Sequence, residues 1–238
     1  MRKVRADLHL HTCLSPCGDD RMQATAIVRQ AGKMGLDMIG ICDHNSAENV
    51  AAVMKAGLRE GLSVIGGMEI TTREEAHILG LFESETDLMK MQEVVYTNLP
   101  SDHYDESFGP QTVIDEWDHV VGANHRLLIG ATTLTVEQLV NAIHECSGLA
   151  IASHVDRERF SLIGQLGFIP DGLRLDAVEV SRPSAMAQQY GYPVVTFSDA
   201  HFLVDIGANC TCFMLEELST NEIRRALRNE MGRSLAGA

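Results

Sequence analysis

Apolar runs of strand length alternate along the chain with stretches of helical periodicity. The runs are RADL (5–8), MIGIC (38–42), LSVIGGM (62–68), HILGLF (77–82), LAIAS (149–153), DAVEV (176–180), PVVTF (193–197) and CTCFML (210–215), with helical patterns at 22–35 and 47–61. This rhythm predicts βα units around parallel strands. Because the runs are nearly continuous in apolar residues, both faces of each strand should be buried. We therefore predict an α/β fold, either a barrel or a doubly wound sheet.

One segment interrupts the rhythm. Residues 83–132 are polar and irregular, with a possible helix around 113–121. A long loop of this kind in a compact domain is usually functional or mobile, so we expect an insertion or lid. The pattern resumes after Thr133, where apolar residues recur at helical spacing as far as Ile143 and a threonine caps the start.

Composition narrows the classes of protein and partner. With 238 residues and 45% hydrophobic content, the chain can bury its own core without disulfides, so the six cysteines are expected to be reduced. We found neither a signal-peptide core nor an apolar segment of about 18 residues, and therefore predict a cytoplasmic protein without a membrane partner. A net charge of −14 disfavours contact with a phosphate backbone, which predicts no nucleic-acid partner. The oligomeric state is left open.

Residues that can bind metal follow five of the predicted strands. They are His9 and His11, Asp43 and His44, Glu69, His154 and Asp156, and Asp199 and His201. In α/β barrels the carboxyl ends of the strands converge on one face, so these side chains should meet there. Imidazole and carboxylate ligands suit zinc, iron or manganese, and the two oxygens of Glu69 could bridge two ions.

The remaining histidines and buried acids have other expected roles. His77 begins the next strand and could supply a second ion from the side. Asp7 and Asp43 are expected to accept hydrogen bonds from the imidazoles and orient them. The other histidines lie away from the strand ends and are expected at the surface: His103, His119, His125 and His144.

The motifs DLHLHT (7–12), CDHN (42–45), GMEI (67–70), SHVDR (153–157) and SDAH (198–201) together resemble those of the polymerase and histidinol phosphatase (PHP) family. The resemblance implies one distorted seven-stranded (β/α) barrel over residues 1–238, with two or three divalent metals at the carboxyl ends of its strands. It also implies three ligand sets: His9, His11, Glu69 and Asp199 for the first metal; Glu69, His77 and His154 for the second; His44 and His201 for the third.

The sequence departs from the family where SPCGDD follows the two histidines. The last ligand of the third metal is therefore open among Cys17, Asp19 and Asp20, and we hypothesise that it is Cys17. A thiolate at this position would favour zinc over harder ions.

The function that the resemblance implies is hydrolysis of a phosphate ester, which we expect to be a small molecule. A hydroxide bridging two metals would attack phosphorus, with Glu69 and Asp199 as the central carboxylates. Arg157 is the best-placed cation for the charge on the phosphoryl oxygens. Two alternatives stay open: an amidohydrolase-type hydrolase, which the lack of lysine after Lys90 weakens, and a metal-binding domain without catalysis.

Overall fold

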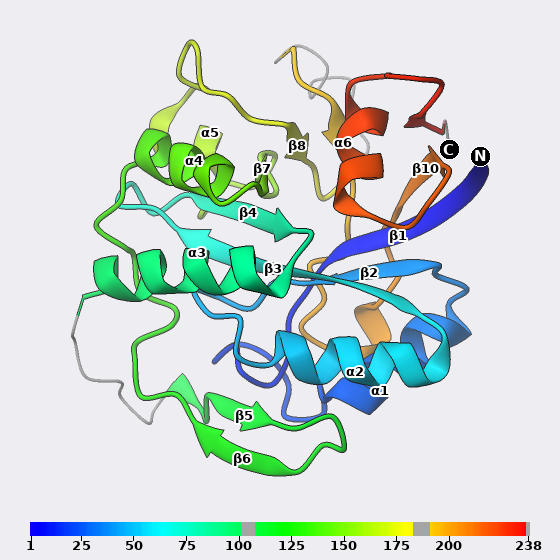
Figure 1. Cartoon of the computed structure of the whole chain (residues 1–238). Coiled ribbons are helices and arrows are strands. Elements are labelled where there is room, and N and C mark those ends of the chain that lie inside the picture. The colour runs from blue at the N-terminus through cyan, green and yellow to red at the C-terminus, as the bar shows by residue number, and fades with distance from the viewer. Residues whose placement is uncertain (101–107, 183–190, 237–238) are drawn as a thin grey trace.

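Strands form at each of the apolar runs, and helices form at the segments of helical periodicity (Figure 1). The computed structural model describes residues 1–100, 108–182 and 191–236. The main sheet contains β1 (Arg2–Leu10), β2 (Met38–Ile41), β3 (Ser63–Thr71), β4 (His77–Phe82), β7 (Leu149–Ala152), β8 (Ala177–Glu179), β9 (Val194–Val195), β10 (Thr211–Leu215) and β11 (Ser234–Leu235). The helices are α1 (Ala24–Lys33), α2 (Val50–Glu60), α3 (Glu85–Asn98), α4 (Val136–Glu145), α5 (Leu162–Leu166) and α6 (Thr220–Leu227), with a 3₁₀ turn, η3 (Leu203–Asp205).

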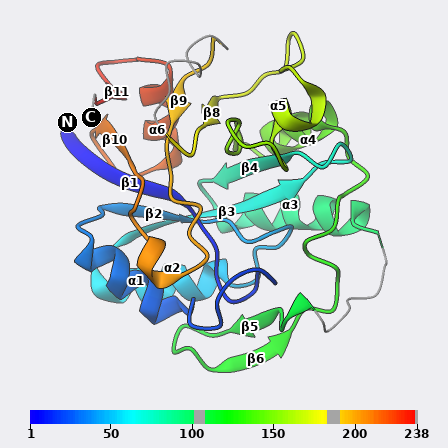
Figure 2. The same cartoon turned by 180° about the vertical axis from the view of Figure 1, so that it is seen from behind.

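The α/β class is confirmed, but the described sheet has nine strands and is a curled half-barrel. Its order is β11-β10-β1-β2-β3-β4-β7-β8-β9. The prediction of parallel strands holds for β1, β2 and β3 and again for β7, β8 and β9. It fails for β4, which runs antiparallel to both of its neighbours, and for β10, which runs antiparallel to β1. The first strand, β1, and the last, β11, lie on either side of β10 and both pair with it, so the two ends of the described chain are close together (Figure 2).

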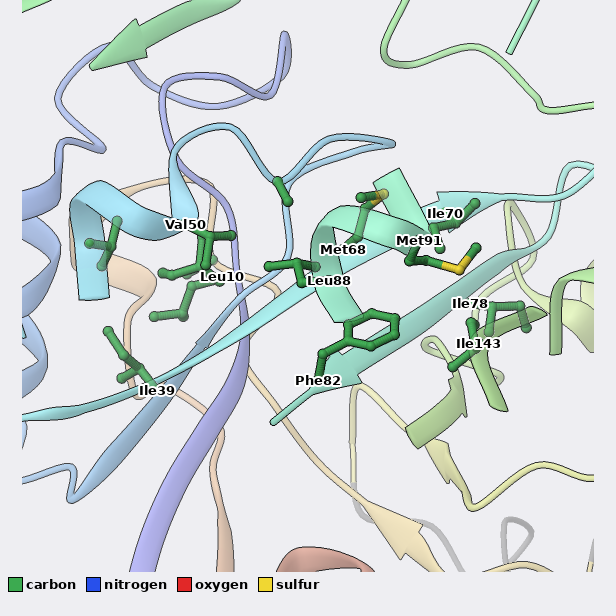
Figure 3. Close-up of a cluster of buried hydrophobic side chains, with 14 of the residues drawn as sticks. Leu10, Ile39, Val50, Met68, Ile70, Ile78, Phe82, Leu88, Met91 and Ile143 are labelled. Carbon is green, nitrogen blue, oxygen red and sulfur yellow. The ribbon is translucent and has the colours of Figure 1, made fainter. Parts of the chain in front are cut away.

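Apolar side chains form a cluster on each face of the sheet. The inner cluster contains Ile65 of β3, Leu81 of β4 and Ile223 of α6. The outer cluster packs α2, α3 and α4 against the sheet, as Figure 3 shows for Phe82 of β4 and Leu88 of α3. Burial of each large apolar side chain stabilises the fold by about 1.5–3 kcal/mol. The strands therefore have two buried faces, which explains their continuous apolar runs.

Local signals in the sequence fix the ends of several helices. Thr135 caps α4 as predicted: its hydroxyl accepts from the backbone N–H of Gln138, and Oε1 of Gln138 accepts from the backbone N–H of Thr135. Helix α2 ends at Gly61, where φ is 73°, a left-handed conformation that glycine adopts without a steric penalty. These caps mark where the chain leaves α2 for β3 and where it enters α4.

The segment 83–132 is more regular than predicted. It begins with α3, whose buried Leu88, Met91 and Val95 pack against the outer face of the sheet. The expected helix around 113–121 is wrong: these residues form a hairpin of β5 (Thr112–Ile114) and β6 (Val120–Ala123), apart from the main sheet (Figure 1). Residues 101–107, which include His103 and belong to the expected lid, lie outside the described residues. Among the described helices, each is too short or too polar to cross a bilayer.

Candidate metal centre

Polar residues occupy one end of the inner face of the sheet, beyond the apolar cluster. On β3, Glu69 follows Ile65 by four residues and so points to the same face. On β4, His77 shares a face with Leu81, and because the strand is antiparallel its first residue pairs with Thr71 at the end of β3. His77 therefore meets Glu69, although His77 begins β4 and Glu69 lies near the end of β3.

A register shift places the paired histidines of β1. Leu8 belongs to the inner cluster and Leu10 to the outer one, and the pairing of β1 with β2 shifts between Asp7 and Leu10. Between these pairs β1 has one residue more than β2, and such a bulge changes the face to which the following side chains point. His9 and His11 consequently project into the polar end of the inner face, where both are fully buried.

The imidazoles surround the carboxylate of Glu69. Its oxygens lie 3.1–3.4 Å from ring nitrogens of five histidines, namely His9, His11, His44, His77 and His154. Asp199 adds a second carboxylate, with Oδ1 3.3 Å from Nε2 of His9 and 3.1 Å from Nε2 of His11. The ring of His201 stacks on that of His11 at 4.1 Å between centroids. The metal ligands predicted from the sequence are thus brought together, with the exception of Cys17, Asp19 and Asp20.

Three groups of these side chains have ligand atoms close enough to share an ion. They are His9, His11, Glu69 and Asp199; His44, Glu69 and His77; and His11, His44 and His201, with all atoms in a group within 4.8 Å of one another. Several ligand atoms are buried without a hydrogen-bond partner: Nδ1 of His44, Nδ1 of His77 and Oε1 of Glu69. Such orphaned atoms are costly unless a cation satisfies them, so the donor set fits divalent metals.

Burial and charge divide the histidines into two kinds. Burial alone would lower the pKa of His11, but hydrogen bonds to Asp199 and Glu69 raise it to about 9. Burial and the charge of His11 instead lower the pKa of His201 to about 4 and that of His44 well below its usual value. Although burial would raise it, the neighbouring charges of His77 and His9 hold the pKa of Glu69 well below its usual value. The centre therefore offers ionised Glu69 and neutral His44 and His201, the forms that bind metal, whereas His11 must release its proton when metal binds.

Two candidate ligands have backbone conformations that favour glycine. The φ angles are 30° at His154 and 52° at Asp199. Non-glycine residues in this region cost about 1 kcal/mol or more and persist where the surrounding structure holds them. Asp199 is held by the bridge between Leu10 and Ala200, which aligns the SDAH loop with the end of β1.

The remaining residues named from the sequence lie around this cluster. Arg157 donates from Nη1 to Asp199 at 2.5 Å and from Nε to the hydroxyl of Ser181 at 2.8 Å. Cys17 is exposed and lines the cavity beside the cluster. Asp19 is paired with Arg21 at 2.7 Å, and Asp20 is exposed and does not line that cavity. Cys17, Asp19 and Asp20 do not belong to the three ligand groups described above.

Glu179 is a site residue that the sequence analysis missed. Its carboxylate lies 2.9 Å from Nδ1 of His9 and is buried. The signal was present, because Glu179 is an acidic residue inside the apolar run DAVEV. Asp7 and Asp43, which were expected in this role, accept from other groups: Asp7 from the backbone of Ser198 and Gly207, and Asp43 from Thr12 and Ser15. The hydroxyl of Ser15 links Asp43 to His11: it donates to Oδ1 of Asp43 at 2.7 Å and lies 2.9 Å from Nδ1 of His11.

A cavity of about 330 Å³ opens onto the cluster. It is lined by Cys17, His44, Glu69, His77, Ile129, His154, Arg157, Arg159, Phe160, Asp199 and His201. Ile129 comes from the segment 83–132, so this segment contributes one wall. Arg159 and Phe160 were not predicted from the sequence.

Of the histidines expected at the surface, His119 and His125 are exposed, and His144 is half-buried against Asp176, away from this cavity.

Comparison with known proteins gives a family match and shared folds. The PHP domain model matches residues 7–163. A PolC-type DNA polymerase III from Lactococcus lactis is 28% identical over 141 residues, which are 55% of this chain and 8% of the polymerase. The lesion-specific endonuclease Q from Pyrococcus furiosus superposes with a TM-score of 0.75 at 19% identity over 98% of this chain and 58% of its own. A chain from Bifidobacterium adolescentis, described as a metal-dependent phosphoesterase, has a TM-score of 0.60 at 20% identity, with 95% and 96% covered.

These matches correct one expectation drawn from charge. An endonuclease Q structure with a TM-score of 0.76 and 20% identity holds a 27-mer duplex with an abasic lesion at its active site. A chain of this fold can therefore act on DNA, and the prediction that nucleic acid is excluded as a partner is wrong. Net charge describes the whole surface, whereas recognition depends on the charges that line one site. The present chain spans less than a tenth of the polymerase and about three-fifths of the endonuclease.

Proposed function

The chain belongs to the PHP domain family, and we propose that it is a metal-dependent hydrolase of phosphoester bonds. The observation that carries the proposal is the carboxylate of Glu69, which lies within 3.4 Å of five imidazoles and belongs to two of the three ligand groups. Divalent ions held there supply an activated water and neutralise charge on the phosphoryl oxygens. Zinc, iron and manganese all suit this donor set, which could hold two or three ions.

The protein's own side chains have separate tasks in this proposal. Glu179 holds His9 with its Nε2 atom toward Glu69 and Asp199. Arg157 is fixed against Asp199 at the rim and contributes positive charge near the substrate phosphate. The buried position of the carboxylates strengthens every charge interaction in the centre, because the local dielectric is low.

We propose that the substrate is a small phosphate ester of about nucleotide size. A cavity of about 330 Å³ lies at the lower end of the range for small-molecule sites. Nucleic acid is a second candidate, favoured by the fold shared with endonuclease Q over 98% of this chain. Enzymes that act on a base within DNA take a single nucleotide out of the duplex, and such a nucleotide needs a pocket of similar size.

A substrate panel tests the proposal. Protein reconstituted separately with zinc, manganese and iron is assayed on phosphomonoesters, phosphodiesters, single-stranded oligonucleotides and an abasic duplex, with an amide and a lactone as hydrolase controls. We expect metal-dependent release of phosphate or of a cleaved strand, absent in Glu69→Gln. Turnover of the amide or lactone alone would support the amidohydrolase alternative. Full metal content without turnover of any substrate would make the chain a binding domain.

A further inference from the structure

Phe160 holds an exposed aromatic ring at the mouth of the metal centre. The side chain is 44% exposed and lines the cavity. Its ring lies nearly parallel to the imidazole of His77, with 5.0 Å between centroids and 15° between planes. A ring that is 44% exposed gains less hydrophobic stabilisation than a buried one, and it leaves apolar surface available inside the cavity.

The backbone fixes the position of this ring. Phe160 has φ of 56°, in the left-handed region where a bulky residue is disfavoured. Its carbonyl accepts a hydrogen bond from the backbone N–H of His77 at 2.9 Å, which joins the loop after β7 to the start of β4. The strained residue is therefore tied directly to a candidate metal ligand, and the ring keeps a defined place relative to the centre.

Arg159 places a cation beside the ring. It lines the same cavity, and among the described residues no carboxylate forms an ion pair with it, whereas the neighbouring Arg157 is engaged by Asp199 and Ser181. In a chain with net charge −14, an arginine at an active-site cavity without an acidic partner is available to an anion.

We propose that Phe160 and Arg159 form a subsite for a nucleotide, with the base stacked on Phe160 and Arg159 directed to phosphate. This inference rests on the proposed function and specifies its substrate class. One face of the ring packs on His77, and the rest is open to a second planar group. Stacking on an aromatic side chain accepts every base, so the subsite reads the nucleotide class and not one base. The nucleotide is either free or an unstacked residue of a nucleic acid.

Paired substrates test the role of the ring. KM is measured for adenosine monophosphate, which has a base, and for glycerol phosphate, which has none. In Phe160→Leu we expect KM for the nucleotide to rise about tenfold more than KM for glycerol phosphate, with Phe160→Tyr restoring the difference. Phe168→Leu is the matched control, because Phe168 is 59% exposed and does not line the cavity. Arg159→Gln should raise KM for both substrates, since both carry phosphate.

Equilibrium binding separates this inference from the proposed function, because it needs no turnover. Calorimetry on the metal-loaded protein compares adenosine monophosphate with inorganic phosphate. We expect the nucleotide to bind about tenfold more tightly than phosphate, and this advantage to disappear in Phe160→Leu. Equal affinities in the wild type, or an advantage that survives Phe160→Leu, would overturn the inference even in an active hydrolase. A 5′-phosphorylated pentathymidylate is titrated in parallel: Phe160 dependence of its binding assigns the subsite to nucleic acid, and dependence with the mononucleotide alone assigns it to free nucleotide.

Discussion

The Nδ1 atom of His9 lies 2.9 Å from Oε2 of Glu179, while Nε2 of the same ring faces Glu69 and Asp199 at 3.4 and 3.3 Å. The carboxylate of Glu179 accepts a hydrogen bond from Nδ1–H, which directs Nε2 to the position where a metal ion would replace its proton. Burial alone would lower the pKa of His9, but Glu179, Glu69 and Asp199 raise it well above its usual value. Glu179 thus fixes the orientation of the His9 ring, while Glu69 and Asp199 face the position that a metal ion would take.

Glu179→Gln should weaken metal binding about 10- to 100-fold, because the neutral amide no longer holds the Nδ1 proton as strongly. Metal affinity is measured by competition with a chromogenic chelator. Glu158→Gln, an exposed position near the site, is the control. An unchanged affinity in Glu179→Gln would show that His9 is oriented by packing alone.

Glu69→Gln should have the larger effect, since Glu69 belongs to two of the three ligand groups. We expect the loss of more than one metal equivalent and a fall in phosphoesterase rate of at least about 100-fold. Elemental analysis and the rate are measured on the same sample. If Glu69→Gln retained every metal and full activity, Glu69 would not be a ligand shared by two ions.

Cys17→Ser should remove one metal equivalent if the thiolate completes the third site. Cys17 lines the cavity with His44 and His201, whereas Asp19 is paired with Arg21 and Asp20 lies outside the cavity lining. Asp20→Asn is the matched variant, expected to keep its metals. The opposite result, with metal lost only in Asp20→Asn, would assign the ligand to the aspartate.

Asn45 connects the centre to the wall that carries Ile129. Its side-chain amide donates to the carbonyls of Leu128 and Gly130 at 2.7 and 2.8 Å, and its own φ of 50° suits asparagine or glycine. Asn45→Gly keeps the backbone conformation and loses these two hydrogen bonds, together with the one that Oδ1 accepts from the backbone N–H of Thr71. We therefore expect a change in the ratio of kcat/KM between small and large phosphate esters. Metal content should stay constant. If metal and activity fall together, this part of the segment 83–132 is structural and does not act as a lid.

The metal-free protein should lose stability as pH rises from about 6.5 to about 9. His11 has an ordinary pKa of 6.5, and its pairing with Asp199 and Glu69 raises the value to about 9 in the folded state. The folded protein then holds this proton more tightly, so the contribution is complete below 6.5 and disappears through 9. Thermal unfolding with a chelator should give a lower Tm at pH 9 than at pH 6, and His11→Gln should reduce that difference. With metal present the trend should reverse, because metal needs the neutral imidazole; a chelated protein with the same Tm at both pH values would contradict the assignment.

The sequence predicted the residues of the centre because their spacing carries physical information. Two histidines one residue apart share a side of a strand, and acids and histidines at the ends of several buried runs converge in an α/β fold. The same reasoning found the strands and the capped helix α4. It failed at 113–121, where exposed Val120 and Val121 in a hairpin gave a pattern similar to that of a helix.

Other features depend on contacts between residues remote along the chain, which no local pattern encodes. The antiparallel direction of β4 puts His77 beside the end of β3, and the register shift in β1 turns His9 toward Glu179, 170 residues away. Arg159 and Phe160 reach the cavity only because the loop after β7 is bonded to the start of β4 through His77. The sequence by itself therefore determined which side chains can bind metal, since ligand chemistry belongs to the residue. The tertiary structure decided which carboxylate orients His9 and which groups face the substrate, because those depend on strand direction and loop packing.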